Sequence, residues 1–456
     1  MTDTTASPRQ AVSALSVDTY RAIWRWHFYA GLIAVPFLIL LAVTGSLYLF
    51  RDEIDHTAFA GRNLVVEQAA PQLQPSALAA NAVAAVPGAT LSAYRQPSGP
   101  SASARVILDS PAGPTYAFVD PYSGAVLDTV VKKQEFNEVV RKLHSLEYFG
   151  AYANRVIEAM AGFAIILVVT GLYLWWPRRK GGGGVVTVRG TPSQRIFWRD
   201  THAVTGAFAG LLIAFLALSG LPWSSFWGAK LTELTVATGT GYPAALWDNV
   251  PVSGEHADHV METVGWTMEA SPMPMSAAME MAPIGLDRAV EEAKRLGIAP
   301  GFEVTVPGSA TGVYTAAVFP DDLQKARTIH IDQYSGQPLV DISYADYGSV
   351  AKLTELGINI HMGQEFGLAN QLLMLATCLA IILASVAAVV MWLKRRPSGR
   401  LGVPPYPASR RVYGALWAMA LVFGVLFPLS GLLIVAMLAV DLLLVRNVPP
   451  LRRAFG

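Results

Sequence analysis

The chain of 456 residues contains a single cysteine, Cys378, which lies inside an apolar run. One thiol excludes a disulfide framework and a thiolate metal cluster, so any redox chemistry requires another carrier. The sequence also lacks a Gly-x-Gly-x-x-Gly motif between a strand and a helix, the mark of a dinucleotide-binding domain. We therefore expect no flavin or nicotinamide domain, and an electron donor would have to be external to the chain.

Charged residues are scarce as well. They make up 15% of the chain, whereas hydrophobic residues make up 53%, and the mean hydropathy is positive. A soluble domain of this length rarely has such a composition, so the chain is predicted to be a membrane protein in contact with a lipid bilayer. The net charge of +1 gives no indication of a nucleic-acid partner, and we expect none.

A repeated pattern indicates that the chain arose by duplication. His144 stands six residues before Gly150, at the head of an apolar run that ends in Trp-Trp-Pro-Arg-Arg. His361 stands six residues before Gly367, at the head of a second apolar run that ends in Trp and a basic cluster. Each run has the roughly twenty apolar residues that a membrane helix needs. Each copy therefore keeps one histidine at the head of a span.

The hydropathy pattern predicts a polytopic α-helical membrane protein with about six spans and two small extracytoplasmic α+β modules. No small-residue cleavage site follows the first apolar run, so this run is interpreted as a retained span rather than a signal peptide. The predicted segments are a disordered cytoplasmic tail (1–20), span 1 (21–50), the first outer module (51–152), span 2 (153–176), a cytoplasmic Gly/Arg loop (177–200), span 3 (201–223), the second outer module (224–367), span 4 (368–393), a cytoplasmic basic loop (394–411), a hairpin of two short spans (412–446) and a cytoplasmic tail (447–456).

The last apolar run, Val412–Val445, is too long for one ordinary span and is broken by Phe-Pro-Leu-Ser-Gly at 427–431. The hairpin is favoured, and a single span, giving five in all, is the alternative. About half of all Lys and Arg residues lie in the N-terminal tail, the two short loops and the C-terminus. Six spans place these segments on one side, so both termini are expected in the cytoplasm and both large loops in the periplasm of a bacterial inner membrane.

Each large loop contains a strand, a turn and a second strand. The turns read Asp-Pro-Tyr-Ser-Gly at 120–124 and Asp-Gln-Tyr-Ser-Gly at 332–336. Asp, Ser and Gly favour turns through local hydrogen bonds and backbone freedom, so the Asp and Tyr residues of both motifs are predicted to form turns rather than to catalyse a reaction. Helical spacing over Ile284–Leu296 predicts a helix in the second loop.

Four of the eight histidines occupy duplicated positions. His27 and His202 lie at the cytoplasmic ends of odd-numbered spans, and each stands eighteen residues before a glycine. His144 and His361 lie at the outer ends of even-numbered spans. Equivalent residues of a pseudo-two-fold bundle approach a common axis, and two facing imidazoles are the ligands that a six-coordinate haem iron needs. His27 with His202, and His144 with His361, are therefore predicted to hold two haems b per chain. The alternative is that they are interfacial residues satisfied by water or lipid headgroups.

Small residues lie midway along three spans, at Thr44-Gly45, Thr170-Gly171 and Ser219-Gly220. Such positions let a flat macrocycle or a neighbouring backbone approach closely. Plain helix packing makes the same demand, so the pattern alone does not separate the two roles.

A Met- and His-rich loop spans 255–283. Thioether and imidazole ligands suit copper(I) in an oxidising compartment, which makes this loop a weak candidate copper site and copper an alternative substrate metal. A flexible filler or a hydrophobic docking surface is the competing interpretation. The candidate ligands are His256, His259, Met273, Met275, Met279 and Met281.

Asp441 is an acidic residue inside the last apolar run. Ionisable residues are costly in a membrane, so Asp441 is expected either to pair with a basic residue at the cytoplasmic face or to accept a proton near a quinol site. The external donor is predicted to be a quinol or a cytoplasmic flavoprotein.

Three features together resemble the PepSY-associated transmembrane helix family: the histidine repeated at the head of a span, the stretch Thr-Gly-Leu-Tyr-Leu-Trp-Trp-Pro-Arg at 170–178, and the paired Asp-x-Tyr-Ser-Gly turns. This family includes PiuB-like proteins and inner-membrane ferric-siderophore reductases, and the similarity extends from about Arg21 to Trp392. The resemblance implies a haem-containing oxidoreductase that passes electrons outward to a ferric siderophore or another periplasmic metal complex and so releases Fe(II). It requires no catalytic side chain, because the electron can leave through the exposed haem edge.

Two other classes of protein fit the same duplication. One is a haem-free transporter of a metal or siderophore, although the spans carry few polar groups at mid-depth. The other is a PepSY-type binding or sensor protein that would use its outer modules to bind a peptide or a peptidase. Both lack haem, so an absorption spectrum separates them from the reductase.

Overall fold

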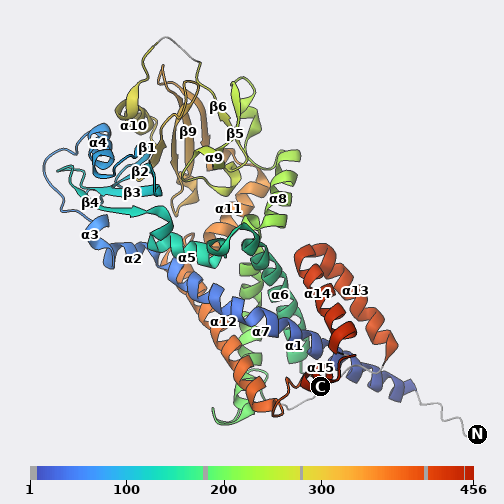
Figure 1. Cartoon of the computed structure of the whole chain (residues 1–456). Coiled ribbons are helices and arrows are strands. Elements are labelled where there is room, and N and C mark those ends of the chain that lie inside the picture. Colours follow the sequence, from blue (N-terminus) through green and yellow to red (C-terminus); the bar gives the residue numbers. More distant parts are fainter. Residues whose placement is uncertain (1–7, 178–182, 278–280, 405–408, 446, 456) are drawn as a thin grey trace, which may run out of the picture. The chain divides into compact units, whose positions relative to one another are not determined.

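The computed structural model describes residues 8–177, 183–277, 281–404, 409–445 and 447–455. The chain forms two compact units, each built from segments that are far apart in the sequence. Long apolar helices dominate the first unit, and the second contains the β-sheet (Figure 1). The first unit comprises Met1–Ser46, Leu143–Phe226 and Leu373–Gly456, and the second comprises Leu47–Lys142 and Trp227–Leu372.

The chain is a membrane protein with five candidate membrane helices among the described residues. Large apolar side chains such as Phe208 and Leu211 are exposed on them, as expected where a helix faces lipid. The candidate spans are Val17–Leu49, Tyr152–Trp175, Arg195–Trp223, Leu368–Arg395 and Pro428–Val445. The corresponding elements are α1 (Pro8–Leu49), α6 (Ala151–Trp175), α7 (Arg195–Ser219) with η3 (Leu221–Trp223), α12 (Leu368–Arg395), and α14 (Pro428–Ala439) with the π-helical η8 (Val440–Val445).

The C-terminal hairpin is present, but only one of its arms has the length of a span. Its first arm is α13 (Arg410–Leu426), whose apolar part is the shorter segment Trp417–Leu426. Pro428 begins the second arm, where proline costs no helical hydrogen bond. Gly424 and Gly431 lie against each other at the turn, which lets the two backbones approach closely. Helix length therefore gives five candidate spans rather than the six that were predicted.

The N-terminal tail and the Gly/Arg loop also differ from the prediction. α1 begins at Pro8, so the described part of the tail that was predicted to be disordered is helical. Residues 178–182 of the Gly/Arg loop lie outside the described residues.

α7 begins at Arg195, six residues before the predicted start of the third span. The reason is Asp200, whose fully buried carboxylate accepts hydrogen bonds from the guanidinium groups of Arg189 and Arg199, each at 2.8 Å. This neutralised carboxylate lets the helix extend through a polar sequence. His202 consequently lies inside α7 rather than at the end of the helix.

The second unit contains one antiparallel sheet of eight strands, in the order β10-β9-β8-β7-β1-β2-β3-β4. Two separate α+β modules were predicted; instead, the first strands of the two repeats, β1 and β7, pair with each other and join two four-stranded halves. This pairing satisfies a strand edge that each half would otherwise expose. The strands are β1 (Thr90–Arg95), β2 (Ala104–Ser110), β3 (Gly113–Val119), β4 (Val126–Val131), β7 (Glu303–Thr305), β8 (Val313–Val318), β9 (Arg327–Asp332) and β10 (Pro338–Ser343).

Helices α4 (Pro75–Ala85) and α10 (Gly285–Arg295) occupy equivalent positions in the two halves and pack on the sheet in one common core (Figure 1). α10 confirms the helix that was predicted in the second loop. The other elements are α2 (Arg51–Thr57), α3 (Ala60–Asn63), α5 (Phe136–His144), α8 (Ser225–Ala237), α9 (Ala257–Val260), α11 (Ser349–His361), α15 (Pro449–Phe455), strands β5 (Val252–His256) and β6 (Pro272–Pro274), and short 3-10 helices at Lys132–Gln134, Glu147–Phe149, Ala244–Trp247, Trp266–Met268, Leu323–Lys325 and Tyr344–Asp346.

The Asp-x-Tyr-Ser-Gly motifs form the β3–β4 and β9–β10 turns, which confirms their predicted role. The Asp120 carboxylate accepts a hydrogen bond from the main-chain N–H of Tyr122 at 2.9 Å. Asp332 accepts the equivalent bond from Tyr334 at 3.0 Å. Both carboxylates are therefore used inside their own turns.

Candidate functional site

The histidines of α1 and α7 lie together in the first unit. The ring centroids of His27 and His202 are 6.0 Å apart, and the ring planes make an angle of 71°. Two imidazoles that bind opposite sides of one metal ion, with metal–nitrogen bonds of about 2 Å, have ring centroids about 6 Å apart. The spacing of this pair therefore matches a metal ion held between two histidines.

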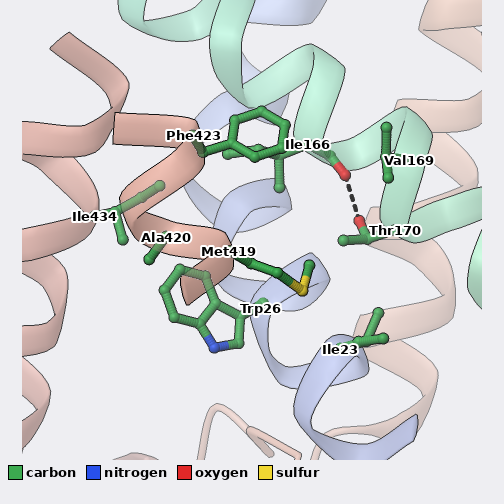
Figure 2. A pocket seen from close by; sticks show the side chains of 9 residues that line it. All are labelled: Ile23, Trp26, Ile166, Val169, Thr170, Met419, Ala420, Phe423 and Ile434. Carbon is green, nitrogen blue, oxygen red and sulfur yellow. Dashed lines mark hydrogen bonds between the residues drawn. The ribbon is translucent and has the colours of Figure 1, made fainter. Parts of the chain in front are cut away.

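Hydrogen bonds fix the proton on Nδ1 of both rings. His202 Nδ1 lies 2.9 Å from the carbonyl oxygen of Ala384, which can only accept. His27 Nδ1 lies 2.9 Å from Thr170 Oγ1, and that hydroxyl donates its own proton to the Ile166 carbonyl oxygen at 2.5 Å (Figure 2). Each Nδ1 must therefore donate, which leaves a free lone pair on each Nε2. A neutral imidazole held in this way is oriented as a metal ligand.

Thr170 and its neighbour Gly171 together hold the His27 ring against α6. A β-carbon at Gly171 would lie only 3.3 Å from His27 Cε1, so the missing side chain makes room for the ring. Thr170 supplies the hydrogen-bond acceptor and Gly171 supplies the space. One of the small-residue pairs noted in the sequence thus has a specific task beside a histidine.

His144 has the same surroundings on α1. Its Nδ1 lies 2.9 Å from Thr44 Oγ1, and that hydroxyl donates to the Leu40 carbonyl oxygen at 2.7 Å. A β-carbon at Gly45 would lie 3.4 Å from His144 Cε1. The hydroxyl of Thr44 and the space at Gly45 therefore hold the His144 ring on α1 as Thr170 and Gly171 hold the His27 ring on α6.

His361 is the last residue of α11 and belongs to the second unit, whereas His144 belongs to the first. The pairing of these two residues stays a prediction. The inner pair, His27 and His202, lies in contact within the first unit, whereas the outer two histidines belong to different units.

Asp441 of η8 forms an ion pair with Arg25 of α1. Arg25 Nη2 lies 3.1 Å from Asp441 Oδ1, and the Tyr29 hydroxyl donates to the same oxygen at 3.2 Å. Arg25 also donates to the Pro404 carbonyl oxygen at 2.6 Å. Of the two roles expected for Asp441, this geometry favours the ion pair.

An apolar pocket lies beside Thr170, between α1, α6, α13 and α14 (Figure 2). Its lining consists almost wholly of carbon atoms, and Trp26 and Phe423 lie on opposite sides of it in this view. Thr170 lies both in the pocket wall and against His27. The pocket therefore adjoins the histidine pair and suits an apolar occupant.

The candidate copper ligands are not gathered at one point. His256 and His259 are exposed, with nearly parallel rings 6.2 Å apart. Met273 is instead buried in an apolar cluster, because it lies on β6, which pairs with β5. Met275 is partly buried, Met281 is exposed, and Met279 lies outside the described residues. Within the described part of the chain, no group of three or more His, Cys, Asp or Glu residues could hold a metal ion.

Glu158, a carboxylate in the N-terminal third of α6, was not among the predicted site residues. It is only 3% exposed, and its Oε2 accepts a hydrogen bond from the Phe226 main-chain N–H at 2.8 Å. The signal was available, because an acidic residue within an apolar run of span length is unusual. Its structural task is to cap the beginning of α8.

Comparison with known proteins identifies a family. A protein-family model described as PepSY-associated TM region matches residues 24–395. The matched region contains all four histidines at the duplicated positions. A comparison with curated proteins found no matching sequence.

Proposed function

The chain belongs to the family of proteins with a PepSY-associated transmembrane region, and from this premise we propose that it is a di-haem b electron-transfer protein of the bacterial inner membrane. It takes electrons from a quinol and passes them to a periplasmic acceptor. That acceptor is a ferric siderophore, whose reduction releases the weakly held Fe(II). The observation that carries the proposal is the His27–His202 pair, with ring centroids 6.0 Å apart and both Nδ1 atoms engaged.

Four histidines would hold the two haems, His27 with His202 at the inner site and His144 with His361 at the outer one. The inner residues fit a haem iron, because both imidazoles have Nδ1 engaged in a hydrogen bond and their ring centroids are 6.0 Å apart. At the outer site, His144 Nδ1 lies 2.9 Å from Thr44 Oγ1. Bound haem supplies a one-electron Fe(III)/Fe(II) couple, which the side chains of the chain lack.

The chain's own residues orient the ligands and connect the two sites. Thr170 and Gly171 hold the His27 ring, and Thr44 and Gly45 hold the His144 ring. His27 and Thr44 are seventeen residues apart on α1, which corresponds to about 25 Å along the helix axis. α1 therefore carries both histidine sites, separated by most of the roughly 30 Å hydrocarbon layer.

The pocket beside Thr170 favours a lipid-soluble quinol over a cytoplasmic flavoprotein as the donor. Its apolar lining suits an isoprenoid compound, and Met419 in its wall is exposed on a helix of the membrane unit. Ala420→Phe should fill the pocket and slow reduction of the protein by a soluble quinol analogue at least tenfold, with dithionite reduction unchanged. Equal quinol rates in both proteins would instead favour a flavoprotein donor.

The topology that accompanies this function has both termini and the short basic loops in the cytoplasm and the second unit in the periplasm. The basic residues of these loops support this orientation. It requires an even number of crossings, so α13 would cross as well as α14.

The test is a dithionite-reduced-minus-oxidised spectrum of the purified protein, with a pyridine haemochrome count per chain. We expect about two haems b, falling towards one in His27→Ala and again towards one in His361→Ala. A protein without haem would discard the reductase and favour a haem-free transporter or a PepSY-type sensor. Release of Fe(II) from a ferric siderophore by the reduced protein tests the acceptor separately.

A further inference from the structure

Two arginines lie directly opposite each other in the central strands of the sheet. The β1–β2 register pairs Arg95 with Arg105. On the far side of Arg95 the β1–β7 register places Glu303, and on the far side of Arg105 the β2–β3 register places Phe118. Like charges opposite each other destabilise an antiparallel pair. The row Glu303–Arg95–Arg105–Phe118 therefore has two cations but one carboxylate.

Glu303 is committed to Arg95. Its Oε2 accepts from Arg95 Nη2 at 2.8 Å and from Arg95 Nε at 3.2 Å, and Arg95 also donates to Thr263 Oγ1 at 2.8 Å. By contrast, the Arg105 guanidinium makes no hydrogen bond and no ion pair within 4.0 Å with any residue that the structure describes. It lies over the rings of Tyr116 and Phe118, 5.2 and 4.9 Å from their centroids.

The carboxylates around Arg105 are engaged elsewhere. Glu135 accepts from Arg62 at 2.7 Å, and Glu262 accepts from the Tyr116 hydroxyl at 2.9 Å and pairs with Lys132. Because Glu135 and Glu262 are already bound to these partners, neither forms an ion pair with Arg105.

Asp55 is the remaining acidic neighbour. Its buried Oδ1 has no hydrogen-bond partner among the described residues, so it does not reach Arg105. Burial raises the pKa of the Asp55 carboxyl, and the charge of Arg105 opposes that rise only in part. Arginine stays protonated in proteins, so Arg105 is a cation with no ion-pair partner within 4.0 Å among the described residues.

The fold does not need a cation at this position. Arg105 faces Phe118 across β2 and β3, and the equivalent pair in the second half of the sheet is Thr315 opposite His330 across β8 and β9. Thr315 Oγ1 and His330 Nδ1 lie 2.9 Å apart and form a hydrogen bond, while His330 Nε2 has no partner among the described residues. Burial lowers the pKa of His330, so this pair carries no charge. One half of the duplicated sheet therefore has a neutral, hydrogen-bonded pair at this place. The other half has a guanidinium that no described residue binds through a hydrogen bond or an ion pair.

We infer that Arg105 is the binding residue for an anionic, oxygen-rich ligand on this face of the sheet. Stacking on Tyr116 and Phe118 fixes the plane of the guanidinium and leaves its N–H groups for a bidentate bond with two ligand oxygens. Catecholate and carboxylate oxygens of a metal chelate have this geometry. The identification of the ligand as an anionic ferric chelate rests on the proposed function, whereas the anion site itself does not.

The experiment measures binding of gallium(III) chelates to the full-length protein, because gallium(III) resembles iron(III) in charge and cannot be reduced in this way. We expect the anionic gallium tris-catecholate complex to bind at least tenfold more weakly to Arg105→Gln than to the wild type. The matched control is Arg288→Gln on α10, where an exposed arginine pairs with Glu291; its affinity should be unchanged. A neutral gallium tris-hydroxamate complex should not distinguish the Arg105 variant from the wild type.

Equal affinity of the catecholate complex for Arg105→Gln and the wild type would overturn the inference. An equal loss with the neutral complex or with Arg288→Gln would overturn it too, because the effect would then be structural or general. If Arg105→Gln fails to fold, Arg105→Lys keeps the charge without the planar fork, and wild-type affinity in that variant would refute bidentate recognition. These outcomes need no haem, so they are independent of whether the protein transfers electrons.

Discussion

Replacing Gly171 by alanine tests whether the histidine pair, rather than helix packing, explains the small residues of the membrane helices. The new methyl group would lie 3.3 Å from His27 Cε1. Carbon atoms in favourable contact are about 3.5–4.0 Å apart, so the ring has to move by a few tenths of an ångström. The ring is the part that can move, because the α6 backbone is held by its own hydrogen bonds.

Two opposing energies decide the outcome. Alanine is about 1 kcal/mol better than glycine inside a helix, whereas crowding a packed site costs about 1–3 kcal/mol. The stability of the whole protein should therefore change little. Metal sites are less tolerant, since ligand distances must stay within about 0.2 Å of their usual values and disturbed ligand supports cost about 10–100-fold in affinity. We expect Gly171→Ala to lose haem from the His27 site and to keep its fold.

The assay is haem content per chain and the reduced spectrum, measured together with the unfolding temperature. Gly414→Ala on α13 is the control, because a β-carbon there would meet no atom within 4 Å. It should gain the same helix propensity and keep all of its haem. If Gly171→Ala binds as much haem as the wild type, with the same spectrum, the close contact with His27 has no functional importance and ordinary helix packing explains the glycine.

Three further predictions concern other contacts. Thr170→Val removes the acceptor for His27 Nδ1–H, so haem affinity at that site should fall about 10–100-fold and Thr170→Ser should restore it, as measured by haem content. Glu303→Gln breaks the ion pair with Arg95, whose side chain is 34% exposed. This change should lower the free energy of unfolding by about 2 kcal/mol and the unfolding temperature by about 4–8 °C. An unchanged temperature would show that the ion pair contributes nothing to stability. Burial, with the charges of Asp258 and Glu355, raises the pKa of Glu269 to about 7. Because an unfolded glutamate titrates near pH 4.3, the folded protein should lose stability, at most about 3 kcal/mol, as the pH rises from about 4 to about 7; Glu269→Gln should therefore raise the unfolding temperature at pH 8 but not at pH 4, and an equal gain at both would contradict this pKa.

The membrane helices were largely predictable, because their signal is local. A run of about twenty apolar residues is visible without knowledge of its neighbours. The equal spacing of His27 and His202 before a glycine also allowed the two to be predicted as neighbours. What spacing could not reveal was the partner of each Nδ1. One is a hydroxyl on α6 and the other is the main-chain carbonyl of Ala384 on α12, and a carbonyl is available at every residue.

The sheet was less predictable, because strand pairing between distant segments leaves little local trace. β7 has only three residues, yet it joins the two halves through its pairing with β1. The copper candidates show a related problem. The alternating methionines suggested a flexible loop, but Met273 lies between Pro272 and Pro274 on strand β6 and is buried. A short strand with one buried side chain and a flexible metal-binding loop can have the same composition.

The duplication explains why the two halves can differ at their most informative positions. A metal-binding imidazole needs any hydrogen-bond acceptor for its Nδ1, so Thr170 can serve His27 while a main-chain oxygen serves His202. A cross-strand pair needs no charge, so the neutral, hydrogen-bonded Thr315–His330 pair is sufficient for the sheet. Arg105 at the equivalent place differs, because its guanidinium forms no hydrogen bond or ion pair with a described residue. The chemistry that a duplicated fold does not itself require is therefore the best guide to what that fold binds, and in this protein it points to an anion at Arg105.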